Sequence, residues 1–217
     1  MNVYLIQPNY RTGFKKHQIP WLPYSVGTCW SYAITDKQIA DNFKLKEIIY
    51  VRENTDSIIE RADSNGVYLF SNYIWNWTYN KTLANKLKNT YPDSTVIFGG
   101  PGVPNDESLR KDINQVDTFI HGMGEQALMN LLKNKLNGIK NPKNITVPMK
   151  SLDDIPSPYT TGLFDDIMEI EDMGMRATLE TNRGCPFPCT FCDWGSVAYR
   201  KLLKFPIEKI KGEIKWF

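Results

Sequence analysis

Short apolar runs alternate with amphipathic segments through residues 1–136. The apolar runs have the length and composition of buried β-strands, and they fall at residues 3–6, 47–51, 67–70, 95–98 and 117–120. Apolar residues at helical spacing between them predict helices at residues 25–39, 56–62, 79–87 and 127–132. The second of these helices is expected to be capped by Thr55 or Asp56. Five β–α units of this kind predict an α/β fold with a parallel, Rossmann-like sheet covered by helices on both faces.

The pattern changes after residue 136. Proline, glycine and asparagine interrupt residues 137–176, which we interpret as a linker. Residues 177–181 then alternate apolar and polar side chains, which predicts a strand. Pro206 stands at the first turn of a predicted helix whose apolar face is formed by Ile207, Ile210, Ile214 and Phe217. The predicted organisation is therefore a sheet domain at 1–136, a linker at 137–176 and a further β/α unit at 177–217.

Several loops at the carboxyl ends of the predicted strands have the composition of ligand-binding loops. Parallel sheets bind ligands at this edge, and glycine lets the backbone approach closely or adopt positive φ. Each glycine pair alone is weak evidence, because ordinary turns also use glycine. The candidate residues at this edge are Gln7, Pro8, Ser71, Asn72, Gly99, Gly100, Pro101, Gly122, Gly124 and Glu125.

Three cysteines, Cys185, Cys189 and Cys192, are spaced C-x3-C-x2-C in a loop that contains two prolines. Three thiolates can hold three irons of a cubane cluster and leave the fourth iron open to a small molecule. A structural zinc site usually needs four closed ligands, and the local count stops at three. Three inert structural cysteines would instead occupy apolar positions of a helix or strand. The spacing therefore favours a [4Fe-4S] cluster over both alternatives.

The cysteine loop resembles that of the radical S-adenosylmethionine (SAM) superfamily, which also has an aromatic residue directly before the third cysteine. The resemblance implies that the open iron binds SAM and that the reduced cluster cleaves it to methionine and a 5′-deoxyadenosyl radical. It also implies that Phe191 lies against the adenine. A strand before the motif and a helix after it would match the first β/α unit of that family's TIM-like barrel.

The sheet ahead of this loop resembles the cobalamin-binding domain of one radical SAM class. The residues that carry the resemblance are Ser71, Gly99-Gly100-Pro101, Gly122-x-Gly124-Glu125 and the segment 22–27. Many cobalamin domains supply a histidine after the first strand. Residues 7–13 contain none, and we interpret His17 as an ordinary surface or loop histidine. The resemblance implies cobalamin as a second cofactor, and the missing histidine leaves open a sheet domain that has lost it.

Composition adds little to this picture. The chain has 217 residues, 41% of them hydrophobic, and a net charge of +2, which is too small to indicate nucleic-acid binding. No apolar stretch reaches the roughly 20 residues that span a bilayer. Acidic residues at 165–172 and basic residues at 200–215 are interpreted as solvated surface. An oxygen-sensitive cluster implies a reducing cytoplasm and an electron donor such as a flavodoxin or ferredoxin.

Three functions remain open at this point. The first is a cobalamin-dependent radical SAM enzyme, with methyl transfer as one reaction. The second is a ligand-binding module with an inert cysteine loop, and the third is a radical SAM protein whose sheet binds no cobalamin. A full barrel needs about 200 residues, and 25 follow Cys192. We therefore expect a second polypeptide to complete the barrel.

Overall fold

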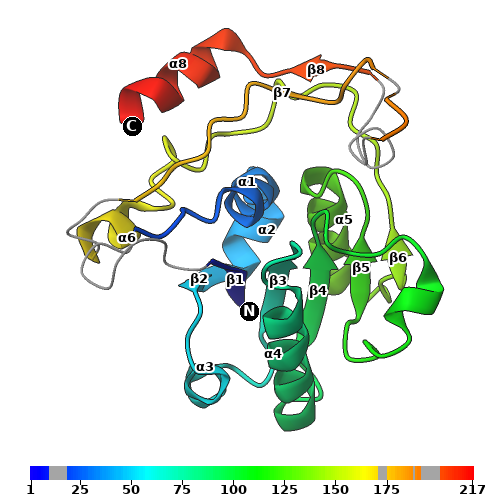
Figure 1. Ribbon diagram of the computed structural model, residues 1–217. Helices are drawn as coiled ribbons and strands as arrows, with labels where there is room; N and C mark the ends of the chain where they lie inside the picture. Colours follow the sequence, from blue (N-terminus) through cyan, green and yellow to red (C-terminus); the bar gives the residue numbers. More distant parts are fainter. Residues whose placement is uncertain (10–18, 171–174, 188, 192–200) are drawn as a thin grey trace.

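The computed structural model describes residues 1–9, 19–170, 175–187, 189–191 and 201–217. Its centre is a parallel six-stranded sheet with helices on both faces (Figure 1). The strand order is β2-β1-β3-β4-β5-β6. The strands are β1 (Asn2–Asn9), β2 (Lys44–Val51), β3 (Val67–Ser71), β4 (Thr95–Gly99), β5 (Thr118–Ile120) and β6 (Asn144–Ile145). The predicted α/β class is confirmed.

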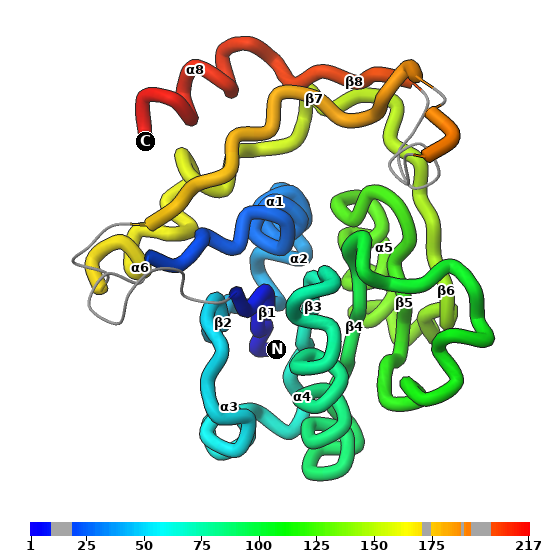
Figure 2. The backbone as a smooth tube through the Cα atoms, viewed as in Figure 1, coloured from blue at the N-terminus to red at the C-terminus, as the bar shows by residue number. Residues whose placement is uncertain are grey.

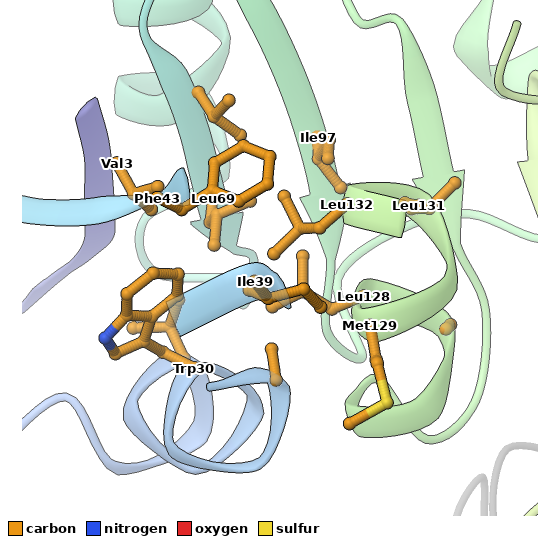
Figure 3. Packing of buried hydrophobic residues seen from close by; sticks show 14 of the residues in the cluster. Val3, Trp30, Ile39, Phe43, Leu69, Ile97, Leu128, Met129, Leu131 and Leu132 are labelled. Carbon is orange, nitrogen blue, oxygen red and sulfur yellow. The ribbon is translucent and has the colours of Figure 1, made fainter. Parts of the chain in front are cut away.

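Two apolar clusters enclose the sheet. On one face lie α1 (Tyr24–Ala33), α2 (Lys37–Asn42) and α5 (Glu125–Leu136), which pack over alternate strand residues such as Val3 and Leu69 (Figure 3). On the other face α3 (Thr55–Arg61) and α4 (Trp77–Thr90) cover the remaining strand residues. All five residues of β3 are buried, because helices cover both faces of this central strand.

The sheet differs from the sequence prediction in three details. It has six strands rather than five, because Asn144–Ile145 pairs with β5. The helix predicted at 25–39 is two helices, since Asp36 accepts hydrogen bonds from the backbone of Gln38 and Ile39 and so starts α2. The N-cap of α3 is Asn54, whose side chain accepts from the Asp56 N–H, so the predicted cap at Thr55 or Asp56 is wrong.

The segment after the sheet consists of short elements that pass over α1 (Figures 1 and 2). They are α6 (Asp165–Ile170), β7 (Asn182–Arg183), β8 (Leu203–Lys204) and α8 (Ile207–Trp216). The strand predicted at 177–181 does not form. An isolated parallel bridge between Trp21 and Arg176 precedes this segment, and no sheet among the described residues includes it. The two-residue strands β7 and β8 instead pair antiparallel, so they join the two ends of residues 184–202.

Helix α8 buries a charged side chain where an apolar one was expected. Glu213 is fully buried, whereas Ile207, Ile214 and Phe217 of the predicted apolar face are each more than half exposed. Lys209 was interpreted as solvated, but its ammonium lies 3.6 Å from the centre of the Phe205 ring and 3.5 Å from the Glu213 carboxylate. Burial lowers the pKa of Lys209, against the opposing effect of Glu213.

No helix among the described residues is long and apolar enough to cross a membrane.

Candidate functional site

The site begins at the carboxyl end of β1. Gln7 and Asn9 are each 7% exposed. The Gln7 carboxamide oxygen accepts a hydrogen bond from a backbone N–H in the first turn of α1, and Asn9 Oδ1 accepts from Trp75 Nε1 at 3.1 Å. The Trp75 ring stacks on Tyr73 with centroids 4.4 Å apart and remains 45% exposed. The edge of the sheet therefore presents an aromatic face that two strand ends hold in place. Pro8, between the two amides, is buried.

Four buried polar residues follow β3 and fix the loop that carries Trp75. Asn72, Asn76 and Asn80 are fully buried, and Ser71 is 5% exposed. Asn76 donates to the Ser71 carbonyl and accepts from the Tyr73 N–H, while Asn80 donates to Asn72 Oδ1 at 2.9 Å. The side chain of Asn72 thus shapes the edge from beneath and has no exposed surface of its own.

The glycines after β4 serve the neighbouring loop. Gly100 has φ +95°, and a Cβ there would lie 2.7 Å from the Asn72 carbonyl oxygen. The Asn72 N–H donates to the Gly99 carbonyl at 2.7 Å, and Gly102 N–H donates to the Asn72 carbonyl. The sequence predicted that these glycines let a ligand approach the backbone closely. At Gly100 the close neighbour is the loop after β3. A Cβ at Gly99 would make only an ordinary contact, and Pro101 is exposed, so these two residues are open to a ligand.

The loop after β5 leads directly into α5. Gly122 has φ +77°, which favours glycine, and a Cβ on Gly124 would lie 2.7 Å from Cys29 Sγ. Glu125, in the first turn of α5, is 2% exposed. Burial, with a smaller effect of the Glu125 carboxylate, raises the pKa of the Cys29 thiol. His121 Nε2 lies 3.3 Å from Asn144 Oδ1 and so faces the sheet edge at β6.

Arg183 connects this loop to the segment that carries the cysteines. Its guanidinium lies 2.8 Å from Glu125 Oε1 and 2.9 Å from the Glu180 carboxylate. Burial alone lowers the pKa of Arg183, but the two carboxylates outweigh it and raise that pKa above its ordinary value. Arg183 stays protonated, and the site holds a permanent positive charge two residues before Cys185.

The cysteine loop is described only in part. Cys185 is half-buried and Cys189 is exposed, and both thiols are free. Gly184, with φ +92°, turns the chain directly before Cys185. Cys192 lies outside the described residues, so the arrangement of the three thiols stays a prediction, as does the contact of Phe191, which is 90% exposed. His17 also lies outside them. Among the described residues, no three His, Cys, Asp or Glu side chains gather as a metal site.

Sequence reasoning missed three parts of this site. Arg183 stands beside the cysteine motif, but nothing in the pattern names a partner 58 residues earlier. Asn76 and Asn80 follow Asn72 at intervals of four, and this repeat of asparagines around the start of a predicted helix was a usable signal. The exposed Trp75 carries no signal of its own, because single exposed aromatics are common.

Comparison with known proteins supports the resemblance drawn from the sequence. No family model matches the chain. It is 34% identical over 227 aligned residues to the cobalamin-dependent radical SAM methyltransferase TokK of Streptomyces tokunonensis, covering 93% of this chain and 32% of TokK. It is 30% identical to the 2-(S-pantetheinyl)-carbapenam-3-carboxylate methyltransferase of Streptantibioticus cattleyicolor, covering 92% of this chain and 32% of that enzyme. The chain is related to the cobalamin-dependent radical SAM proteins. It spans about a third of the length of these curated relatives.

Solved structures of radical SAM proteins share the fold. OxsB with aqua-cobalamin bound matches 99% of this chain, with a TM-score of 0.68 and 18% identity over 31% of its own length. TsrM from Kitasatospora setae, with cobalamin and a [4Fe-4S] cluster bound, matches 99% of this chain, with a TM-score of 0.63 and 14% identity over 45% of its length. At these identities the likeness is one of fold, and it extends through the segment after the sheet as well as the sheet itself.

Proposed function

We propose that this chain is the cofactor-binding part of a cobalamin-dependent radical SAM enzyme. The observation that carries the proposal is that the start of the cysteine loop contacts the carboxyl edge of the sheet. We call the paired strands β7 and β8, at the two ends of the cysteine loop, the neck of this loop. In the neck, Arg183 Nη2 lies 2.8 Å from Oε1 of Glu125, the first residue of α5. A ligand at the carboxyl edge of the sheet and a cluster on the cysteine loop would therefore be neighbours. When bound, the cluster would supply the electron that cleaves SAM, and cobalamin would supply a methyl carrier.

The residues at the sheet edge fit a large, flat ligand. The stacked pair Tyr73 and Trp75 presents an exposed aromatic face, and Asn9 fixes the orientation of the indole. A Cβ at Gly99 would make only an ordinary contact, 3.6 Å from Ile120, and Gly122 supplies a backbone turn without a side chain. In this proposal the chain's own residues hold the macrocycle by contact area and shape, without a histidine ligand from the loop after β1.

The cysteine loop fits a cluster by its donor set. Cys185 and Cys189 are free thiols, and the thiolate of cysteine is the form that binds metal. In this proposal Cys192 is the third ligand, and Phe191 contacts the adenine of SAM.

Anaerobic reconstitution tests the cluster. The chain should bind about four irons with a broad absorption near 400 nm, as a cubane cluster does. Replacing Cys189 by Ala should abolish this absorption, while Cys29→Ala should retain it. A colourless protein that holds one zinc would contradict the proposal.

Titration with hydroxocobalamin tests the second cofactor and separates the alternatives. Saturable binding together with 5′-deoxyadenosine formation from SAM supports the proposal. Cobalamin binding without SAM cleavage would favour a binding module. SAM cleavage without cobalamin binding would favour a radical SAM protein whose sheet serves another purpose.

Methyl transfer, the need for the remaining barrel and the need for an electron donor are also part of the proposal. The relatives are named methyltransferases and are about three times as long as this chain, so we propose that multiple turnovers need the remaining barrel and a flavodoxin or ferredoxin. Multiple turnovers by the purified 217 residues with a chemical reductant would contradict the need for the remaining barrel.

A further inference from the structure

One guanidinium joins two parts of the chain that are distant in sequence. Arg183 Nη2 lies 2.8 Å from Glu125 Oε1, and its Nε and Nη2 donate to the two oxygens of Glu180 at 2.9 Å. The Glu180 contact is local, three residues away, whereas Glu125 belongs to the sheet domain. The Arg183 side chain is 17% exposed and that of Glu125 is 2% exposed. Each buried charge therefore depends on the other for compensation.

Apolar packing surrounds this ion pair. Leu203 and Phe205, which follow the cysteine loop, are buried against Met123 from the loop after β5, together with Leu152 and Ile155. The guanidinium carbon of Arg183 lies 5.4 Å from the centre of the Phe205 ring. The same two segments thus meet through an ionic contact and through an apolar one, and water is largely excluded from the former.

The ion pair also fixes where the cysteine loop begins. Arg183 pairs with Leu203 across β7 and β8, and the Phe205 N–H donates to the Thr181 carbonyl at 3.1 Å. Cys185 follows Arg183 after one residue, Gly184. A displacement of Arg183 would therefore be passed to the first cysteine through a single residue.

We propose that the ion pair between Arg183 and Glu125 is a positioning device that sets the separation between the cluster loop and the ligand edge of the sheet. The inference rests on the proposed function, because it assigns the pair to the spacing of cluster and cobalamin. Glu125 was predicted to contact cobalamin directly. In this proposal it acts through Arg183, since one carboxylate oxygen binds the guanidinium and the other is buried and accepts no hydrogen bond from the described residues.

The test compares two carboxylates that bind the same guanidinium. Glu125→Gln removes the charge of the cross-domain contact, and Glu180→Gln is the matched control that removes the charge of the local one. Both variants of the full 217-residue chain are loaded with iron–sulfur cluster and hydroxocobalamin, reduced, and examined by electron paramagnetic resonance. The magnetic coupling between the reduced cluster and cob(II)alamin reports their separation. We expect Glu125→Gln to weaken this coupling or to broaden the distribution of its values, while iron content and cobalamin affinity are retained. We expect the coupling in Glu180→Gln to stay near that of the wild type.

A second readout needs no cofactor. Hydrogen exchange at the Phe205 amide reports the docking of the neck, and we expect exchange at least about tenfold faster in Glu125→Gln, with the amides of β3 and β4 unchanged. Glu125→Asp keeps the charge but shortens the side chain, and it should give an intermediate effect if Glu125→Gln proves unstable. Arg183→Lys keeps the charge and loses the two-sided geometry, and it should also weaken the coupling.

The outcomes separate this inference from the proposed function. Equal coupling and equal Phe205 exchange in the wild type and in Glu125→Gln would overturn the inference while leaving the proposed function intact. A wild-type chain that binds no cluster or no cobalamin would overturn the proposed function. In that case faster Phe205 exchange in Glu125→Gln would still support the docking role of the pair, and unchanged exchange would overturn it.

Discussion

Two large apolar clusters enclose the sheet, whereas the segment with the cysteines is held by smaller apolar clusters together with ion pairs. The sheet strands bury residues such as Leu5, Leu69 and Phe98 between helices on both faces. The apolar clusters of the later segment are smaller. This segment buries Glu213 and leaves the Arg183 side chain 17% exposed, while large apolar side chains such as Ile207 are exposed. The first region gains its stability from the apolar area that its strands and helices bury together. The second depends on a few directional contacts, so a single substitution should displace it without unfolding the sheet.

The largest expected effect tests the area-based half of this comparison. Phe98 is fully buried against Phe70, Phe119 and Trp77. Phe98→Ala should lower the free energy of unfolding by about 3–5 kcal/mol, because it leaves a cavity between the sheet and α4. Urea denaturation followed by circular dichroism measures this. The control Phe217→Ala, at a residue 53% exposed on α8, should cost less than about 1 kcal/mol, and a comparable loss at both positions would refute the comparison.

The next effect concerns the backbone contact at the ligand edge. Gly100→Ala places a Cβ 2.7 Å from the Asn72 carbonyl in a left-handed conformation. It should cost about 2–3 kcal/mol of unfolding free energy and weaken hydroxocobalamin binding, since the two loops must separate. Gly99→Ala, whose Cβ lies 3.6 Å from Ile120, is the matched control and should cost less than about 1 kcal/mol. If Gly99→Ala is the more damaging of the two, the assigned contact is wrong.

A smaller effect is expected from the asparagine network below the loop. Asn76→Ala removes a buried hydrogen bond to the Ser71 carbonyl and a partly buried one from the Tyr73 N–H. The loss should be about 1–3 kcal/mol of unfolding free energy, and the loop with Trp75 should hold hydroxocobalamin less tightly. Asn89→Ala, which removes an exposed bond between Asn89 and Asn85, serves as the control. Equal losses in the two variants would show that burial of the network does not matter.

The smallest effect is a pH dependence at the surface of the sheet. Asn2 and Tyr4 donate hydrogen bonds to Asp63 and hold the pKa of its carboxyl below the ordinary value of 3.8. Because the folded state depresses this pKa, the stabilisation is complete at neutral pH and is lost as the pH falls below 3.8 through the folded value. Asp63→Asn should therefore flatten the acid limb of a plot of stability against pH. An unchanged acid limb would show that Asp63 makes no such contribution.

The central part of the fold could be predicted because its strands are continuous apolar runs. Residues 67–70 and 95–98 have few polar positions, and only a strand buried on both faces has that pattern. The sixth strand could not be predicted, since Asn144–Ile145 is short and takes its stability from pairing with β5. The strand expected at 177–181 failed for the opposite reason. Alternation is necessary for a half-buried strand, but a continuous neighbouring strand is also required, and no sheet in the described part of the chain takes up this segment.

The candidate site was predictable where local chemistry determines it. The thiol spacing C-x3-C-x2-C and the turn at Gly100 could be predicted from the sequence, because each is a property of one short segment. The partners were not predictable. Gly100 has no room for a Cβ because the Asn72 backbone lies against it, and the charge of Arg183 is compensated by Glu125. The fold brings both pairs together from segments that are distant in sequence.

The pairing of β7 with β8 has a consequence for how metal would be acquired. Residues 184–202 leave and rejoin the folded chain at the same place, because Arg183 and Leu203 are partners. The entropy of closing this loop is therefore lost during folding and not during metal uptake. Cys185 and Cys189 belong to a loop whose two ends are paired. Once one thiol binds iron, the effective concentration of the other is higher than it would be in an open chain. Folding of the sheet, by docking this neck, thus favours cluster assembly before iron arrives.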